Sequence, residues 1–213
     1  MLWVESNKML KRTHLVDLNY KVKNIFPISI HQFQINDFDD IKGKLIDYTY
    51  DAKKKDSVGA IISNRGGWQS SPIDFYEDDD FLCNILFNCL SKLPFLKNER
   101  VDYKIDAWIN INKKGDYNVK HNHPASHLSG VLWIKCPKKA GEIVFTSPYS
   151  FMGYKEHKLY SDNFKKEHSA YIMYNFQPKE GFILLFPSHL VHHVNENQSD
   201  EDRISVAFNL RFE

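Results

Sequence analysis

Two short histidine clusters hold the side chains of this sequence that are best suited to bind a metal. Of the 10 histidines, six lie in the segments HNHPASH (121–127) and PSHLVHHV (187–194). Neutral imidazole is the commonest metal ligand among side chains. In an extended segment, His121 and His123 point to the same face and can contact one ion. A third ligand from the second cluster would complete a facial triad with positions left open for a cosubstrate and oxygen.

A histidine pair alone is a weak signal, because such pairs more often lie at a protein surface. The segment RISVAFNLRF (203–212) strengthens the interpretation, because its alternation places Arg203, Ser205 and Asn209 on the polar face of one strand. A guanidinium fork and a hydroxyl two residues apart can bind the same carboxylate. This pairing suits the far end of a dicarboxylate cosubstrate. The alternative is an amphipathic strand whose polar side faces solvent.

These residues need a scaffold of short strands, and the second half of the chain has that pattern. Residues 101–112 alternate between apolar and polar side chains, which is the period of a half-buried strand. Further strands are predicted at 129–135, 142–146, 169–177, 181–186 and 203–212, and Pro or Gly lies between most of them. The pattern predicts a mainly β fold, an antiparallel barrel or jelly roll.

The first hundred residues are expected to support that barrel within one domain that covers residues 1–213. Apolar spacings of three and four predict helices at 37–55 and 78–93, the first capped by Asn36 or Asp37. Short apolar runs at 26–30 and 33–35 suggest edge strands. Residues 101–213 would then form the jelly-roll core.

Two connecting segments are candidates for the rim of a substrate site. The segment SNRGGWQSS (63–71) is either a plain connection or a loop packed over a cavity mouth with Trp68 as its anchor. Residues 149–168 form a long polar connection, and loops of that length often bind ligands.

Composition limits the class of protein. The formal net charge is +1, which gives no strong signal for nucleic-acid binding. The 3 cysteines form no CxxC pair, which favours a reducing, cytoplasmic setting over a disulfide framework. The N-terminus is too polar for a signal peptide, and no apolar run is long enough to cross a membrane.

The order of these motifs is similar to that of a known family. The segments HNHPASHLSGVLWIKCP, GEIVFTSP, GFILLFPSHLVHHVNEN and RISVAFN, preceded by NRGGWQS and WININKKGDYNVKH, resemble the 2-oxoglutarate- and Fe(II)-dependent oxygenases of the prolyl-hydroxylase-like group. The resemblance covers roughly residues 60–210. It implies a double-stranded β-helix (jelly-roll) barrel, iron at one mouth of the barrel, and 2-oxoglutarate as the cosubstrate.

The resemblance also assigns metal ligands. His121 takes the place of the first iron ligand, and His123 the second, where most of the wider superfamily carries Asp or Glu. If His123 is not the ligand, Glu142 or Asp116 could supply the carboxylate. His192 matches the third ligand, while its neighbour His193 would point to the opposite face of a strand.

The cosubstrate residues follow in the same way. Arg203 matches the arginine that binds the cosubstrate, and Ser205 is its companion. Asn110 and Asn209 are further candidate contacts in the barrel lumen, or alternatively ordinary polar residues that fill it.

The resemblance implies a dioxygenase that uses Fe(II), 2-oxoglutarate and O2 and releases succinate and CO2. The expected reaction is hydroxylation of a peptidyl or small-molecule substrate, whose identity the sequence does not specify. One alternative is a three-histidine, cupin-like dioxygenase that binds its substrate directly to iron without 2-oxoglutarate. Another is a non-catalytic jelly-roll binding protein. A monomer and a homodimer are both open.

Overall fold

Two antiparallel sheets form the body of the protein in a computed structural model. The structure describes residues 21, 23, 28–73, 80–93, 103–149 and 158–212. The larger sheet has the strand order β1 (His31–Gln34), β9 (Phe182–Pro187), β6 (Leu128–Lys135), β11 (Arg203–Phe212), β4 (Tyr103–Asn112) and β3 (Trp68–Gln69). The smaller sheet has the order β2 (Asn64–Arg65), β5 (Tyr117–His121), β10 (His192–Val194), β7 (Ile143–Thr146) and β8 (Met173–Phe176).

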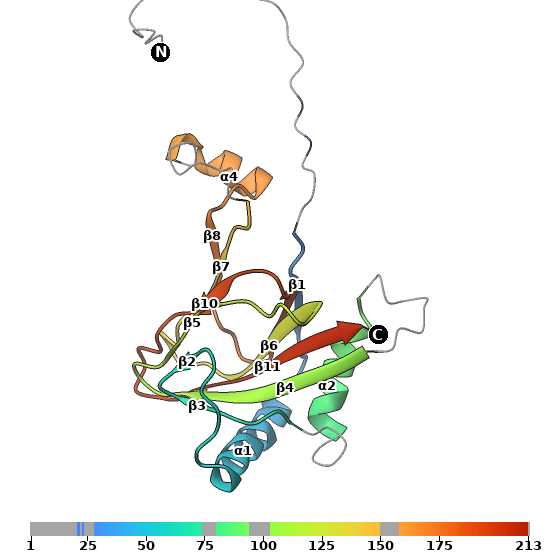
Figure 1. Cartoon of the computed structure of the whole chain (residues 1–213), viewed down its shortest axis with the longest axis vertical. Helices are drawn as coiled ribbons and strands as arrows, with labels where there is room; N and C mark the ends of the chain where they lie inside the picture. Colours follow the sequence, from blue (N-terminus) through green and yellow to red (C-terminus); the bar gives the residue numbers. More distant parts are fainter. Residues whose placement is uncertain are drawn as a thin grey trace, which may run out of the picture.

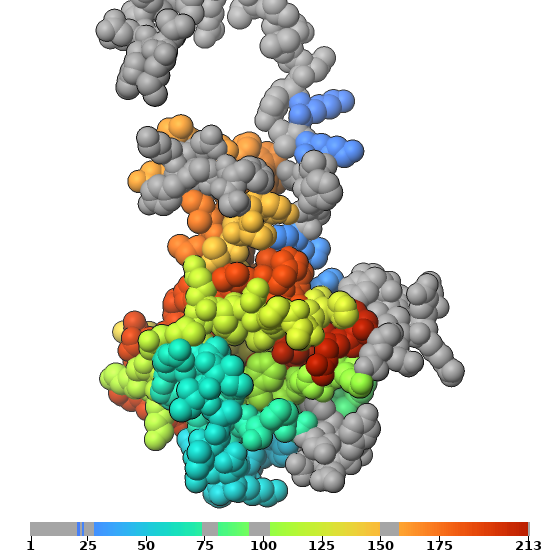
Figure 2. Space-filling model, in the orientation of Figure 1, coloured from blue at the N-terminus to red at the C-terminus, as the bar shows by residue number. Residues whose placement is uncertain are grey.

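Three described helices accompany the sheets. Two of them, α1 (Asp39–Lys55) and α2 (Asp80–Leu90), lie against the six-stranded sheet (Figure 1). The third, α4 (Asp162–His168), lies at the far end of the arm formed by β7 and β8. Figure 2 shows α1 and α4 on opposite sides of the sheets, in cyan and orange. Among the described residues, no helix is both long and apolar enough to span a bilayer.

Side chains that alternate along the long strands point either into a core that faces the helices or into a polar lumen between the sheets. On β11, Ile204, Val206 and Phe208 are at most 1% exposed and pack with α1 and α2 residues in one apolar cluster. The intervening residues, including Arg203 and Ser205, line a cavity between the sheets. A smaller apolar cluster between the sheets is made by Trp133, Ile143, Phe145, Leu184, Phe186 and Leu190. The barrel therefore has an apolar exterior under the helices and a partly polar interior.

The mainly β fold predicted from sequence is confirmed, and its long elements match closely. The segment 203–212 forms β11 over the predicted range, and 101–112 forms β4 from Tyr103 onward. Helix 37–55 is α1, and 78–93 contains α2. Residues 74–79 and 94–100 lie outside the described residues, as do residues 26 and 27 of the predicted strand 26–30.

Several local predictions were wrong. The N-cap of α1 is Phe38 without a side-chain hydrogen bond, because Asp37 adopts a left-handed φ of 51° and closes the preceding turn through its carbonyl oxygen. Residues 28–30 are not strand, and the edge strand begins at His31. The polar connection 149–168 contains α4, whose first turn is capped by the Ser161 hydroxyl accepting from the Phe164 N–H at 3.2 Å.

Trp68 does not lie over a cavity mouth. Its strand β3 pairs with β4, and its ring packs in the helix-facing core at 5% exposure. The indole N–H donates to the carbonyl oxygen of Asp56 at 2.8 Å. Trp68 therefore holds the 56–69 segment to the core, and the proposed rim role at this residue was wrong.

Candidate metal and cosubstrate site

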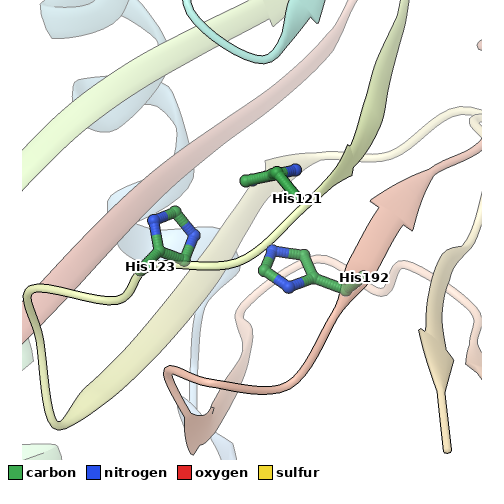
Figure 3. Close-up of side chains that lie close together, drawn as sticks. All are labelled: His121, His123 and His192. Carbon is green, nitrogen blue, oxygen red and sulfur yellow. The ribbon is translucent and has the colours of Figure 1, made fainter. Parts of the chain in front are cut away.

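Strand pairing in the smaller sheet brings the two histidine clusters together. His121 is the last residue of β5 and His192 the first of β10, and the two are direct partners in the antiparallel ladder. His123 lies two residues beyond β5, where its backbone N–H donates to the carbonyl oxygen of Ser188 at 2.9 Å. The three rings lie around a shared space (Figure 3), and one ring nitrogen from each lies within 4.8 Å of the others.

Backbone carbonyls fix the orientation of two of these rings. Nδ1 of His121 lies 2.7 Å from the carbonyl oxygen of Val119, and Nδ1 of His192 lies 2.9 Å from that of Leu190. A carbonyl oxygen only accepts, so each Nδ1 carries the proton and Nε2 keeps its lone pair. This arrangement is typical of histidines that bind metals through the remaining nitrogen.

Burial keeps all three rings neutral. Desolvation lowers the pKa of His192 to about 3 and that of His123 to about 4, and it also lowers the pKa of His121. The proximity of His121 lowers the pKa of both of the other rings further. At neutral pH the cluster therefore offers three uncharged nitrogen ligands, which is what a divalent transition metal requires.

The alternative carboxylates lie elsewhere. Glu142 accepts hydrogen bonds from Gln177 at 2.7 Å and from Asn195 at 2.9 Å. Asp116 accepts from the backbone N–H of Lys113 at 2.6 Å. Neither belongs to the metal-ligand cluster found among the described residues.

The remaining histidines of the two motifs are also outside the cluster. His193 pairs with Val144 in the ladder, one position along from His192, so its side chain points to the other face of the sheet. His127 accepts a hydrogen bond at Nδ1 from the backbone N–H of Phe212 at 3.0 Å, and His189 is exposed.

Arg203 carries an unpaired donor into the same cavity. Its side chain is 2% exposed, and Nη1 donates to the carbonyl oxygens of Ala140 at 2.5 Å and Asn195 at 3.0 Å. Nη2 is buried with no hydrogen-bond partner among the described residues. Burial lowers the guanidinium pKa to about 10, so the group is still charged at neutral pH. A buried charge with an unused donor is costly unless an anion pairs with it.

The histidines and Arg203 line one cavity between the sheets, of about 60 Å³. Ser205 and Asn110, which pair directly across β11 and β4, line it as well. Asn209 does not: it lies beyond the cavity lining, where its Oδ1 accepts from the Ser129 hydroxyl at 2.7 Å.

The lining residues that the sequence prediction did not name as site residues include Ser63, Trp108, Asn112 and Asn118. The alternation along β4 put Trp108 and Asn112 on the face of Asn110, so a signal existed for these two. Ser63 and Asn118 meet only through the pairing of β2 with β5, where the Asn118 amide donates to the Ser63 hydroxyl at 3.1 Å.

Comparisons with known proteins agree with this site. Residues 106–209 match the family model described as "Putative 2OG-Fe(II) oxygenase", a range that contains all three histidines and Arg203. Over this range the chain matches the 2OG-Fe(II) oxygenase family. No curated protein matches it by sequence. The family assignment predicted from the sequence is confirmed.

Solved structures show the same fold at low sequence identity. A prolyl-4-hydroxylase from Pseudomonas putida has a TM-score of 0.59 at 14% identity, covering 87% of this chain and 94% of that one. A prolyl hydroxylase from Trichoplax adhaerens, in complex with a hypoxia-inducible factor peptide fragment, has a TM-score of 0.57 at 11% identity, with 84% and 83% covered. HygX from Streptomyces hygroscopicus, with nickel and 2-oxoglutarate bound, has a TM-score of 0.53 at 8% identity, with 86% and 82% covered.

This 2OG-Fe(II) oxygenase is an oxidoreductase whose cofactors are Fe(II), 2-oxoglutarate and O2. Its residues fit these groups, because three neutral imidazoles converge on one point and a buried guanidinium nitrogen is left unpaired in the same cavity.

Proposed function

We propose that this oxygenase hydroxylates a peptidyl or small-molecule substrate, with His121, His123 and His192 as the iron ligands. Arg203 and Ser205 would bind the outer carboxylate of 2-oxoglutarate, with Asn110 as a further polar contact. The single observation that carries the proposal is the unpaired Arg203 Nη2 in the cavity that the three histidines line. Asn209 has no place in this scheme, because it lies outside the cavity lining.

When bound, iron and 2-oxoglutarate would supply the oxidising chemistry: one atom of O2 would enter succinate as 2-oxoglutarate loses CO2, and the other would enter the hydroxylated substrate. The chain's residues hold and orient these groups. The carbonyl oxygens of Val119 and Leu190 retain the Nδ1 protons of His121 and His192, so that each Nε2 would be free to bind the metal.

Charge explains why this ligand set favours an anionic cosubstrate. Three neutral imidazoles leave both positive charges of Fe(II) uncompensated by the protein, whereas an Asp or Glu ligand would cancel one. The buried Arg203 adds a further positive charge to the cavity. A dianion that contacts both the metal and Arg203 would cancel two of these three positive charges, and low dielectric strengthens both contacts.

Apolar side chains restrict water around the metal ligands. The rings of Phe186 and Phe145 lie 5.0 Å and 5.8 Å from the ring of His192 between centroids. The ring of Trp108 lies 5.9 Å from that of His123, again between centroids. These contacts fix the imidazoles in position and exclude solvent from one side of the site.

Anaerobic addition of Fe(II) and then 2-oxoglutarate tests the proposal, because joint binding gives a weak metal-to-ligand absorption band in the visible range. Arg203→Ala is expected to weaken 2-oxoglutarate binding by about 10- to 100-fold, the loss of a charge-assisted hydrogen bond. Fe(II) affinity should stay unchanged. The matched control is Arg211→Ala on the same strand, where Arg211 pairs with Asp106 at 2.7 Å outside the cavity.

Other outcomes identify the rivals. Fe(II) binding without any 2-oxoglutarate band would favour a cupin-like dioxygenase that binds its substrate directly. Failure to bind Fe(II) at all would leave the histidine cluster without its proposed role.

A further inference from the structure

A second, larger cavity of about 600 Å³, which we call the aromatic groove, is lined in part by Phe145, whose ring contacts that of His192. One part of its lining comes from the β7–β8 arm, from residues 147–149 and from α4 with the residues just after it. The other part comes from the described residues before β1 and from β1 itself. The side chains that define it are Phe145, Tyr171, Tyr174 and Phe176 on the arm and Ile28 and Ile30 before β1. In Figure 1 the arm stands off the barrel beside β10, the strand that carries His192.

Strand register ties the aromatic groove to the proposed iron ligands. Across the smaller sheet, His121 pairs with His192, His192 with Phe145, and Phe145 with Tyr174. Directly paired residues project from the same face of a sheet. The four side chains therefore form one row, and Tyr174 stands two strands, or roughly 10 Å, from the backbone of His192.

Ring contacts continue this row away from the site. Phe145 lies 5.8 Å from His192 and 5.9 Å from Phe176 between ring centroids. Tyr174 follows at 5.1 Å from Phe176, and Tyr171 at 5.2 Å from Tyr174. Tyr174 is 47% exposed although it lies on the row of a buried histidine. The row thus ends in open aromatic surface, against which a flat apolar group would pack.

The charges in the lining have one sign. Lys23 and Lys166 are among the described lining residues, and the same set contains no Asp or Glu. The lining also includes His168 and the hydroxyl groups of Ser147 and Ser169. A bound group with a negative charge would therefore meet cations and hydrogen-bond donors without a repelling carboxylate.

We propose that the aromatic groove binds the primary substrate of this oxygenase, and that this substrate is a small molecule with a flat apolar body and an anionic group. The inference rests on the proposed function, because it places the substrate beside the iron ligands. The volume lies within the roughly 300–1,000 Å³ of small-molecule sites, which are mostly apolar with a few placed polar groups.

Ligand NMR on the full chain loaded with metal and saturating 2-oxoglutarate tests this. The probes are phenylacetate, its neutral amide and phenethylamine, which share a ring and differ in charge. Phenylacetate should bind saturably and most tightly of the three. Its protons should broaden more with Mn(II) than with diamagnetic Zn(II), since paramagnetic broadening falls steeply with distance and Phe145 of the groove lies next to the proposed ligand His192.

Paired variants locate the binding. Tyr174→Ala should weaken phenylacetate binding by about two- to tenfold, the value of one aromatic contact. Lys166→Glu should weaken it by at least as much. The controls are Met173→Ala, the neighbour of Tyr174 that points away from the groove lining, and Lys138→Glu, an exposed site with the same charge change. Both controls should bind like the parent chain.

Four results would overturn the groove proposal: no saturable binding of phenylacetate, no preference for it over the amide and amine, equal broadening with both metals, or binding that ignores Tyr174→Ala. A peptide that binds where no small probe does would assign the surface to a peptidyl substrate instead. Normal Mn(II) and 2-oxoglutarate binding with no probe bound rejects the groove alone. Probe binding in a chain that fails to bind metal rejects the proposed function instead.

Discussion

The imidazole of His123 leaves the proposed iron site without a negatively charged ligand. Its spacing from His121 was visible in the sequence, and the structure brings both next to His192. The sequence could not decide between His123 and a carboxylate from Glu142 or Asp116, because that choice depends on which side chains reach the same point. Glu142 is held elsewhere by Gln177 and Asn195, which are remote in sequence, while Asp116 closes a local turn with the backbone N–H of Lys113.

Substitutions at this position separate ligand identity from charge. His123→Ala should lower Mn(II) affinity by at least about tenfold, because one of three ligands is lost. His123→Asp should retain most of the affinity, because a carboxylate restores a ligand and cancels one charge of the metal. Electron paramagnetic resonance of free Mn(II) measures both constants.

The control is His189→Ala, an exposed histidine of the second motif that lies outside the cluster. Its Mn(II) affinity should equal that of the parent. If His123→Ala binds Mn(II) as tightly as His189→Ala does, His123 is not a ligand.

The neutral histidines also predict a pH dependence for the metal-free protein. An unfolded histidine titrates near its ordinary pKa of about 6.5, whereas folded His192 titrates near 3. As pH falls through this window the unfolded chain binds a proton that the folded chain does not, so stability falls with it.

Urea unfolding with a chelator present measures the effect between about pH 7 and pH 4. His192→Asn should reduce the loss of unfolding free energy over this range by about 2–3 kcal/mol. This value is smaller than the full pKa shift would give, because relaxation of the site reduces the free-energy cost of protonating the buried ring. Parallel pH curves for the parent and the variant would show that His192 is not held neutral by burial.

The strand β6 illustrates how one element serves both the core and the site. Gly130 lines the cavity of the histidines, and a Cβ at this position would meet the ring of Phe208 on the paired strand β11. Phe208 is 1% exposed in the helix-facing core and has little room to move. Because Gly130 has no side chain, the ring of Phe208 can pack directly against the backbone of β6.

Gly130→Ala is expected to lower the unfolding free energy by about 1–3 kcal/mol, the usual cost of overpacking a core. Gly43→Ala is the matched control, because an added Cβ there meets nothing within 4 Å and the residue lies exposed within α1. It should stabilise the protein by about 0.5–1 kcal/mol. Urea unfolding of both variants gives the comparison, and equal stability of the two would refute the steric role of Gly130.

Elements with a strong internal pattern were predictable, and those defined by their partners were not. Strands β4 and β11 each extend over 10 residues with clear alternation, so their ranges followed from sequence. Strands β2 and β3 have only 2 residues each and exist through pairing with β5 and β4. No periodicity can be read from two residues, so the 63–71 segment was interpreted as a loop.

At the scale of the whole molecule, stability and chemistry occupy different layers. The helices α1 and α2 bury the outer face of the six-stranded sheet, while the histidines and Arg203 lie between the two sheets. The jelly-roll class followed from the succession of strands, and it is confirmed. The position of the polar cavity between the two sheets could not be predicted from the sequence. Alternating apolar and polar side chains define two faces of a strand, but they do not show which face lines the lumen.

Because the lumen holds a buried unpaired guanidinium and three desolvated imidazoles, ligands that pair with them should stabilise the whole fold. A ligand that binds only the folded state at 100 times its dissociation constant adds about 2.7 kcal/mol. For a chain of this size that raises the melting temperature by roughly 5–10 °C. Thermal denaturation should show one such rise with Mn(II) and a further rise when 2-oxoglutarate is added.

Two variants assign each rise to its residues. His192→Ala should lose the response to Mn(II), and Arg203→Ala should keep that response while losing most of the response to 2-oxoglutarate. Arg211→Ala, on the same strand but outside the cavity, should keep both. If Arg203→Ala still responds fully to 2-oxoglutarate, the unpaired Nη2 is not the group that receives the cosubstrate, and its burial then has another cause.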